Sequence, residues 1–246
     1  MRYWMVAPAT ALLAAFGVTS AGAADILSNP LFNPQPTLVQ NWSGVYLGGH
    51  VGYAWDHRDA SIFSPAGALL ATGSTSADSM TGGGQLGFNY ALTRQWIVGV
   101  EADISGANLH STSVGASGFG QRDSKIDVFG TVRGRLGYAW DSLLLYGTGG
   151  FAWADEEIVR TQQIGTVNGA TPGTVEKASA IGTGWAAGGG LEWMFMPNWS
   201  LRAEYLHLDI GTKLFSFPLS RQRIEGNARI DIARVGLNYA LNWGSR

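Results

Sequence analysis

Three features of the sequence predict an all-β fold, an eight-stranded antiparallel up-and-down transmembrane β-barrel. Apolar side chains alternate with small or polar ones along eight segments, which places each set on its own face of a strand. Trp and Tyr lie near segment ends, where lipid-facing strands carry them at the two membrane–water interfaces. Long and short connections alternate between segments, as an up-and-down barrel with long external loops and short periplasmic turns requires.

The N-terminal residues are typical of a secretory signal. Arg2 provides a positive start, residues 6–17 an apolar run, and Ala21 and Ala23 a small-residue cleavage site. The run is too short to cross a bilayer as a helix, which needs about 20 apolar residues, so a membrane anchor is the weaker alternative. The predicted organisation is a signal peptide (1–23), a periplasmic N-terminal arm with three prolines (24–41) and an outer-membrane β-barrel (42–246).

The composition excludes several classes of function. There is no Cys, so neither disulfides nor thiolate metal sites are available. The formal net charge is −2 with both signs spread along the chain, which gives no electrostatic case for nucleic-acid binding. The 35 glycines are about twice the usual share, and their presence inside apparent strands indicates bends and close packing.

The first segment, residues 42–55, shows the alternation most clearly. Its even positions are mostly small, with His50 as the polar exception, and we expect this set to face the lumen. Its odd positions are expected to face lipid: Val45, Leu47, Val51, Tyr53 and Trp55, with Gly49 between them.

The remaining segments repeat this pattern in order. The eight predicted strands are roughly 42–55, 79–90, 96–106, 125–140, 143–154, 183–195, 199–210 and 228–241. Long polar stretches follow the odd-numbered segments, near 57–78, 107–124, 155–182 and 211–227, and short links occupy 91–95, 141–142 and 196–198. A Greek-key sandwich is not expected to alternate long and short connections in this regular way. The even number of segments leaves both termini in the periplasm.

The outward face of the later segments is apolar. Its predicted members are Leu86, Phe88, Tyr90, Trp96, Val98, Val100, Ile104, Ile126, Val128, Val132, Leu136, Tyr138, Trp185, Leu191, Trp193, Phe195, Val235, Leu237 and Tyr239. The residues expected at the membrane interfaces are Trp42, Tyr53, Trp55, Trp96, Tyr138, Trp193, Trp199 and Tyr239. Residues 143–151 are apolar on both phases near their start, which leaves their facing open.

The opposite face of these strands carries charge. The predicted interior ionic network comprises Glu101, Asp103, Lys125, Asp127, Arg133, Arg135, Glu192, Arg202, Glu204 and Arg234, five acids and five bases. A lipid-facing Arg or Lys costs about 2–4 kcal/mol at the bilayer midplane, so these charges belong inside. An eight-stranded barrel is just wide enough for its own side chains. We therefore expect a plugged lumen centred on Glu101, Arg133, Arg202 and Glu204, with a narrow ion-conducting pore as the alternative.

The sequence contains no convincing motif for catalysis or cofactor binding. Residues 82–87 match the dinucleotide-binding glycine pattern, but a strand continues where that motif needs a helix. The histidines, His50, His57, His110 and His207, lack metal-ligand spacing, although His57 and His110 fall in or near predicted external loops where a heme or metal contact is conceivable. We expect no enzyme activity and no cofactor.

The predicted strands resemble the small outer-membrane barrels of alphaproteobacteria called outer-membrane immunogenic proteins, with OmpA/OmpX-type barrels as more distant relatives. The resemblance covers NWSGVYLGGHVGY (41–53), GGGQLGFNY (82–90), VGVEAD (98–103), TVRGRLGY (131–138), YGTGGFA (146–152), GWAAGGGLE (184–192), PNWSLRAEY (197–205) and RVGLNY (234–239). It implies a terminal aromatic residue read by the barrel assembly machinery. Leu241 holds the expected position, and Trp243 lies in the same alternation.

These observations predict a structural and surface-interaction protein of the Gram-negative outer membrane, a surface antigen with a role in envelope integrity. Its expected partners are membrane lipid and lipopolysaccharide, the barrel assembly machinery, and a host or phage surface ligand met through the loops. The alternatives are a narrow porin-like channel and a heme-binding surface protein, both functions found in the family that the chain resembles. The loops carry no motif that names a ligand.

Overall fold

The computed structural model describes residues 41–64, 66–114, 120–163, 165, 171–219 and 222–241. The predicted signal peptide, the arm before Asn41 and the candidate assembly residue Trp243 lie outside these described residues. No helix in the described part of the chain is long and apolar enough to cross a membrane.

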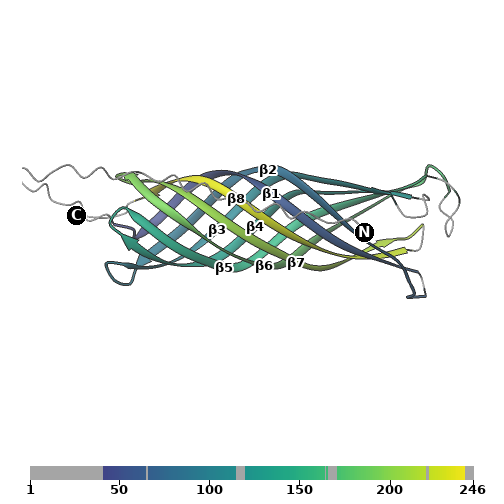
Figure 1. Cartoon of the computed structure of the whole chain (residues 1–246), viewed down its shortest axis with the longest axis horizontal. Coiled ribbons are helices and arrows are strands. Elements are labelled where there is room, and N and C mark those ends of the chain that lie inside the picture. Colours follow the sequence, from purple (N-terminus) through teal and green to yellow (C-terminus); the bar gives the residue numbers. More distant parts are fainter. Residues whose placement is uncertain are drawn as a thin grey trace, which may run out of the picture. The chain divides into compact units, whose positions relative to one another are not determined.

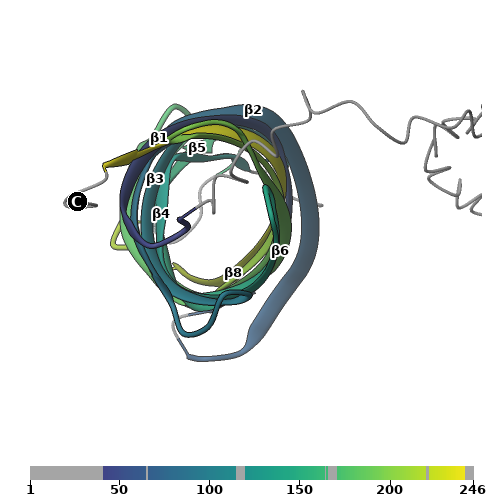
Figure 2. The same ribbon diagram turned by 90° about the vertical axis from the view of Figure 1, so that its left-hand side faces the viewer.

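Eight antiparallel strands form a closed barrel in sequence order, with β8 returning to pair with β1 (Figures 1 and 2). The strands are β1 (Gly44–Phe63), β2 (Leu69–Ala91), β3 (Trp96–Val114), β4 (Gly120–Trp140), β5 (Leu143–Gln162), β6 (Val175–Met196), β7 (Trp199–Phe217) and β8 (Gln222–Leu241). The predicted fold class is confirmed.

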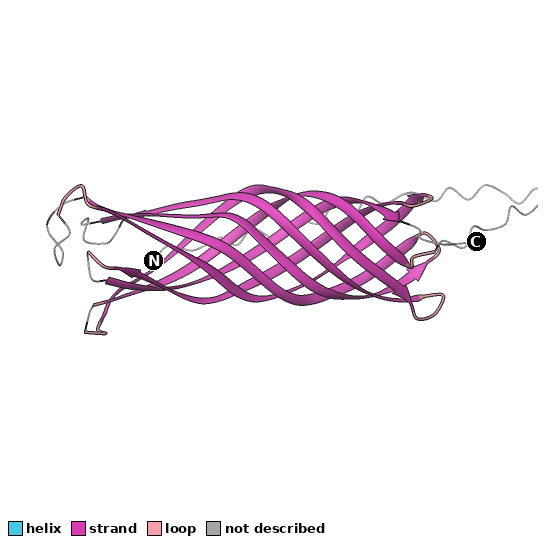
Figure 3. Cartoon of the chain, turned by 180° about the vertical axis from the view of Figure 1, so that it is seen from behind, coloured by secondary structure: helices cyan, strands magenta, loops and turns pink. Residues whose placement is uncertain are grey.

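The strands are longer than the sequence pattern indicated (Figure 3). Most residues assigned to long loops continue as strand, because alternation persists there with smaller and more polar side chains. One end of the barrel, here called the turn end, carries the connections at 92–95, 141–142 and 197–198, and the opposite end is called the loop end. Asp141 and Asn198 have φ of 48° and 68° in the two tightest turns, a conformation that Asp and Asn tolerate.

The turn-end half of the barrel has an apolar outer wall. Its exposed side chains include Leu47, Leu86, Val132, Leu191 and Val235. The facing of β5, left open by its sequence, is settled in the structure: Leu144 and Tyr146 point inward and Leu143, Leu145 and Phe151 outward.

The interior is filled by alternating apolar and ionic layers. Near the turn end lies an apolar layer with Trp42, Ile97, Ala139, Leu144, Tyr146 and Met194. An ionic layer follows, then a large apolar layer that includes Leu109, Phe129, Leu206, Leu208, Ile210, Ile230 and Ile232. A second ionic layer and a third apolar layer, formed by Ile62, Ile158, Phe215, Phe217 and Ile224, continue toward the loop end. Burial of these side chains supplies the hydrophobic stabilisation of the barrel interior.

A bulge in β4 overturns part of the predicted facing. The β4–β5 register shifts between Ile126 and Val128, so Asp127 has no partner of its own. Asp127 is exposed and Val128 is not buried, whereas Ile126, predicted to face lipid, is fully buried. The extra residue resets the alternation on its N-terminal side. When the period of two is extended from the C-terminal part of β4 to the residues before 128, it therefore assigns inward side chains to the lipid face and outward side chains to the lumen.

Candidate functional site

The most organised polar site in the described residues is the ionic layer inside the turn-end half of the barrel. We call it the lumen cluster, and it consists of Glu101, Asp103, Arg133, Arg135, Glu192, Arg202, Glu204 and Arg234. The members lie at inward positions of β3, β4, β6, β7 and β8 and are all buried. Their neighbours along each strand point outward, which follows from the alternation of a β-strand.

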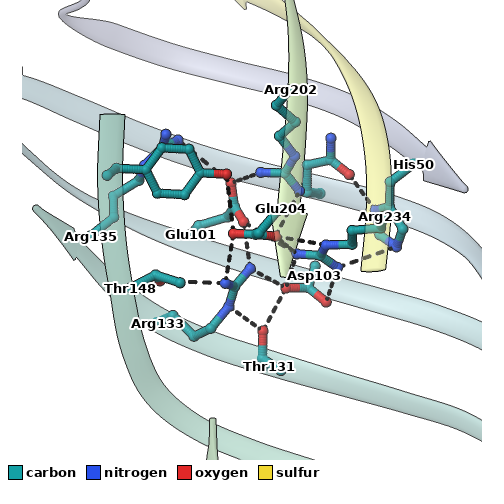
Figure 4. A network of polar contacts seen from close by, with 12 residues as sticks. His50, Glu101, Asp103, Thr131, Arg133, Arg135, Thr148, Arg202, Glu204 and Arg234 are labelled. Carbon is teal, nitrogen blue, oxygen red and sulfur yellow. Dashed lines mark hydrogen bonds and ion pairs between the residues drawn. The ribbon is translucent and has the colours of Figure 1, made fainter. Parts of the chain in front are cut away.

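Arg133 forms the centre of the lumen cluster (Figure 4). Its Nη2 lies 2.6 Å from Glu101 Oε1 and 2.9 Å from Asp103 Oδ2, both on β3. Its Nη1 reaches 3.0 Å to Glu204 Oε1 on β7, and its Nε donates to Thr131 Oγ1 at 2.8 Å. The guanidinium of one β4 residue thus joins strands on different sides of the lumen.

Two further arginines complete the charge balance around these carboxylates (Figure 4). Arg202 Nη1 lies 2.5 Å from Glu101 Oε2. Arg234 Nη2 lies 2.6 Å from Glu204 Oε2, and its Nη1 lies 3.2 Å from Asp103 Oδ1. Each carboxylate therefore has more than one cationic neighbour, which offsets the cost of removing it from water.

Arg135 and Glu192 extend the cluster toward the turn end. Arg135 Nη2 donates to Glu192 Oε2 at 2.7 Å, and its Nη1 donates to the Tyr46 hydroxyl at 2.7 Å. Tyr46 in turn donates to Glu101 Oε2 at 2.6 Å, which links the two parts of the cluster. The Arg135 guanidinium also lies 4.0 Å from the ring centroid of Tyr146, within cation–π range.

His50, predicted to enter the lumen, lies beside the cluster (Figure 4). Its Nδ1 is 2.5 Å from Gln85 Oε1, and its Nε2 is 2.8 Å from Ser105 Oγ. Arg234 Nη1 lies 3.4 Å from the same Nε2. These contacts make His50 part of the polar packing between β1, β2, β3 and β8.

The cluster is electrically neutral, with four carboxylates facing four guanidinium groups. Every acid is engaged by a permanently charged arginine, so none of them has the free, polarised geometry of a general acid or base. Apolar layers lie on both sides of the cluster. The arrangement joins strands from different sides of the barrel through buried ion pairs.

Two predicted members of the network are not in the lumen. Lys125 Nζ lies 2.8 Å from Asp127 Oδ1, and the two side chains are 46% and 54% exposed on the outer wall. Their interior placement was wrong because the β4 bulge inverts the faces on its N-terminal side. Since the pair is itself neutral, its removal leaves the balance of the interior charges unchanged.

One predicted interface aromatic residue is also placed differently. Trp42 is buried at the turn end, and its Nε1 donates to the Asp141 carbonyl oxygen at 3.2 Å. It caps the interior and does not face lipid. The other predicted members, Tyr53, Trp55, Trp96, Tyr138, Trp193, Trp199 and Tyr239, are exposed or half-buried on the outer wall, several in ring contacts such as Trp96–Tyr138 and Trp199–Tyr239.

A second ionic layer in the loop-end half was missed. We call it the outer cluster: Asp56, Arg58, Glu156 and Lys213. Lys213 Nζ lies 2.7 Å from Glu156 Oε2, and Arg58 contacts Asp56 and Ser124. Arg58, Glu156 and Lys213 fell in stretches interpreted as loops, and Asp56 directly follows the first predicted strand. The signal that could have found them is the continued period of two after residue 154, where Glu156, Ile158 and Arg160 all face inward.

The glycine pattern and the remaining histidines lie within strands. Residues 82–87 lie within β2, so the glycine pattern is part of a strand. His57, His110 and His207 all lie in strands: β1, β3 and β7. His207 Nδ1 contacts Asp231 Oδ1 at 2.7 Å on the outer wall. Among the described residues, no group of three or more His, Cys, Asp and Glu side chains is arranged to hold a metal ion.

A closed barrel with an apolar outer wall and a charged, filled interior defines the class of outer-membrane β-barrel proteins. The family model described as "outer membrane protein beta-barrel domain" matches residues 11–240, and the chain belongs to this family. The 31 kDa outer-membrane immunogenic protein of Brucella melitensis is 35% identical over 240 residues, covering 93% of this chain and 97% of the relative. The resemblance seen in the sequence is confirmed.

More distant proteins agree with this assignment. The 25 kDa outer-membrane immunogenic protein of Brucella abortus is 27% identical over 235 residues, which cover 94% of each chain. The crystal structure of the outer membrane protein OprG from Pseudomonas aeruginosa matches with a TM-score of 0.51 at 13% identity, covering 82% of this chain and 99% of that one. The latter likeness concerns the fold alone.

Proposed function

We propose that this protein is a non-enzymatic, non-conducting outer-membrane barrel that contributes to envelope integrity and presents its loop end at the cell surface. The observation that carries the proposal is Arg133, whose buried guanidinium joins carboxylates of β3 and β7 from β4. A hydrated pore needs room at this level, whereas eight strands leave space only for side chains. Apolar layers above and below the lumen cluster add two further barriers to ions.

The charges on the outer wall support an orientation with both termini in the periplasm. Exposed ion pairs such as Lys125–Asp127 and Lys177–Glu157 lie on the loop-end half of the wall. Charged side chains are disfavoured against lipid tails, so this half belongs above the hydrocarbon region. We infer that the lysines there contact lipopolysaccharide phosphates and that the loops beyond them contact host or phage molecules.

Planar-bilayer recording tests the sealed lumen. We expect purified, refolded protein to give no steady channel openings, under conditions in which a wide porin inserts and conducts. Gel mobility before and after boiling verifies that the inserted protein is folded. Reproducible openings of uniform size from the folded protein would overturn the proposal and favour the narrow-channel alternative.

A further inference from the structure

Two of the strand ladders stop halfway along the barrel. The β2–β3 ladder runs from Ala91–Ile97 only as far as Thr81–Ala107, although both strands continue for several residues. The β6–β7 ladder likewise stops at Gly184–Ile210. The other ladders run nearly the full length of their strands. The loop-end half therefore consists of two four-stranded sheets, β7-β8-β1-β2 and β3-β4-β5-β6, separated by two seams.

Each seam begins next to an irregularity in one of its strands. The β3–β4 register shifts between Gly106 and Leu109, beside the last β2–β3 pair. The β7–β8 register shifts between Ile210 and Lys213, beside the last β6–β7 pair. A β-bulge bends its strand and terminates pairing. The seams are thus built into the strands that border them.

The seam between β6 and β7 is bridged. Lys213 on β7 reaches across the interior to Glu156 on β5 at 2.7 Å. The backbone N–H of Leu219, which follows β7, donates to Glu176 Oε1 on β6 at 2.8 Å. Glu176, Lys177 and Lys213 also place charges along this seam, which is a common protection against strand addition.

The seam between β2 and β3 is also bridged through the interior, because Arg58 of β1 donates to the Leu109 carbonyl oxygen of β3 at 3.2 Å and contacts Ser124 of β4. Its β2 edge, however, carries no cation. The cross-seam bonds Thr81 Oγ1 to the Gly106 carbonyl oxygen (2.9 Å) and Asn108 N–H to Ser79 Oγ (3.3 Å) lie at its base. Residues 69–80 of β2 read LLATGSTSADSM, with no Lys, Arg or Pro and one acid, Asp78, that accepts from Tyr53. Most of their described side chains are exposed, on both faces of the strand. Figure 2 shows the blue ribbon of β2 outside the ring of the other strands.

We propose that the seam-side edge of β2, residues 69–80, docks an extended, uncharged polypeptide segment of another molecule by β-strand addition. The free edge offers main-chain donors and acceptors to any extended chain, and its small Ser, Thr and Ala side chains leave room for a β-branched partner strand. The absence of cations along residues 69–80 removes the usual barrier to such pairing. This inference rests on the proposed function in one respect: a partner outside the cell reaches this edge because the loop end lies at the cell surface.

A second copy of the chain is a poorer occupant of the same edge. Two copies in one membrane are related by an axis along the membrane normal. That symmetry brings two identical tilted edges together in the same direction and at a crossing angle, so their main chains do not align for pairing.

Binding of a short probe peptide to the detergent-solubilised full-length protein tests the proposal. In the probe, Thr and Val alternate between terminal lysines that keep it soluble, and a matched peptide carries N-methyl groups at every second backbone nitrogen. We expect the first peptide alone to bind, and to slow amide hydrogen exchange in residues 69–80 but not in 175–183. Ser76→Lys should weaken binding about tenfold or more, whereas Ser179→Lys on the β6 edge should leave it unchanged.

Several results would overturn the inference. These are the absence of peptide binding, equal binding of the N-methylated peptide, and protection outside residues 69–80. A dimer that Ser76→Lys converts to a monomer would assign the edge to a second copy and likewise overturn the stated occupant. The heat-dependent gel shift establishes that each variant is a folded barrel. The assay uses isolated protein, so its result is independent of conductance and of membrane orientation.

Discussion

At the scale of single residues, Arg133 has the most demanding environment in the barrel. Its side chain is fully buried. Two of its three carboxylate neighbours lie on β3 and the third on β7, and these two strands are not adjacent to one another. Arg133→Ala leaves these acids with fewer cations in a water-poor interior. We expect a loss of about 3–5 kcal/mol in the free energy of unfolding, measured by urea titration of Trp fluorescence in lipid vesicles.

Two matched variants define what the Arg133 result means. Arg133→Lys keeps the charge but loses the planar fork, so its loss of stability should lie between those of wild type and Arg133→Ala. Lys125→Ala removes a half-exposed cation from the outer wall and should leave stability unchanged. Equal stability of Arg133→Ala and Lys125→Ala would contradict a structural role for the lumen cluster.

Neighbouring glycines on β2 provide a second contrast at this scale. A Cβ at Gly83 would collide with the Ile104 carbonyl oxygen and lie 2.9 Å from the Ser105 Cα, both on the paired strand β3. A Cβ at Gly84 would have its nearest contact at 3.6 Å, an ordinary van der Waals distance. We expect Gly83→Ala to cost about 1–3 kcal/mol and Gly84→Ala to be tolerated in the same urea titration. Similar losses for both would show that Gly83 is not sterically required.

At the scale of the strands, the sequence predicted the number, order and pairing of the elements but not their length. Alternation with strong apolar contrast marks only the lipid-facing part of each strand. Beyond it, pairs such as Glu156 and Glu157 differ in burial without differing in chemistry, so hydropathy carries no signal. Lys125 and Asp127 were misplaced because a bulge depends on the register between strands, which one strand's sequence does not encode.

The candidate site could be predicted from the sequence wherever the alternation shows which side chains of a strand point inward. Glu101, Arg133, Arg202 and Glu204 lie in segments of regular alternation, and the structure brings them together. Their specific pairing depends on strand stagger around the closed barrel, which positions residues of β3, β4 and β7 at one level. The outer cluster escaped prediction because its residues lie beyond the lipid-facing pattern.

The bridge across the β6–β7 seam leads to a prediction about these elements. Lys213→Met removes the 2.7 Å contact between Lys213 Nζ and Glu156 Oε2. Arg58, whose Nη1 lies 3.5 Å from Glu156 Oε1, then remains as the cation beside this carboxylate. We expect a loss of about 1.5–3 kcal/mol and faster amide exchange in the loop-end parts of β6 and β7, measured by mass spectrometry. The lipid-facing parts of both strands should exchange as in wild type.

A surface lysine provides the comparison for this experiment. Lys177 is 66% exposed and lies 3.6 Å from Glu157, so Lys177→Met should change neither stability nor exchange. Acceleration spread over the whole barrel in Lys213→Met would argue against two separable sheets in the loop-end half.

At the scale of the whole barrel, the turn-end half of the outer wall is mainly apolar, and the exposed ion pairs lie on the loop-end half. Leu47, Val100 and Leu237 are exposed near the turn end, whereas exposed Lys177 and Arg229 belong to the loop-end half. We expect lipid to cover the first region and water the second. On this expectation the barrel extends from the membrane on the side that carries both seams and the outer cluster.

This asymmetry predicts which residues can be labelled from outside the cell. The chain has no cysteine, so single substitutions give unambiguous sites. Thr171→Cys lies at an exposed loop-end position and Arg94→Cys at an exposed turn-end position. We expect a membrane-impermeant maleimide to label Thr171→Cys on intact cells and Arg94→Cys only after the outer membrane is permeabilised. Both should react equally once it is permeabilised. Labelling of Arg94→Cys but not Thr171→Cys on intact cells would place the loop end in the periplasm, and the seam of β2 would then meet periplasmic partners.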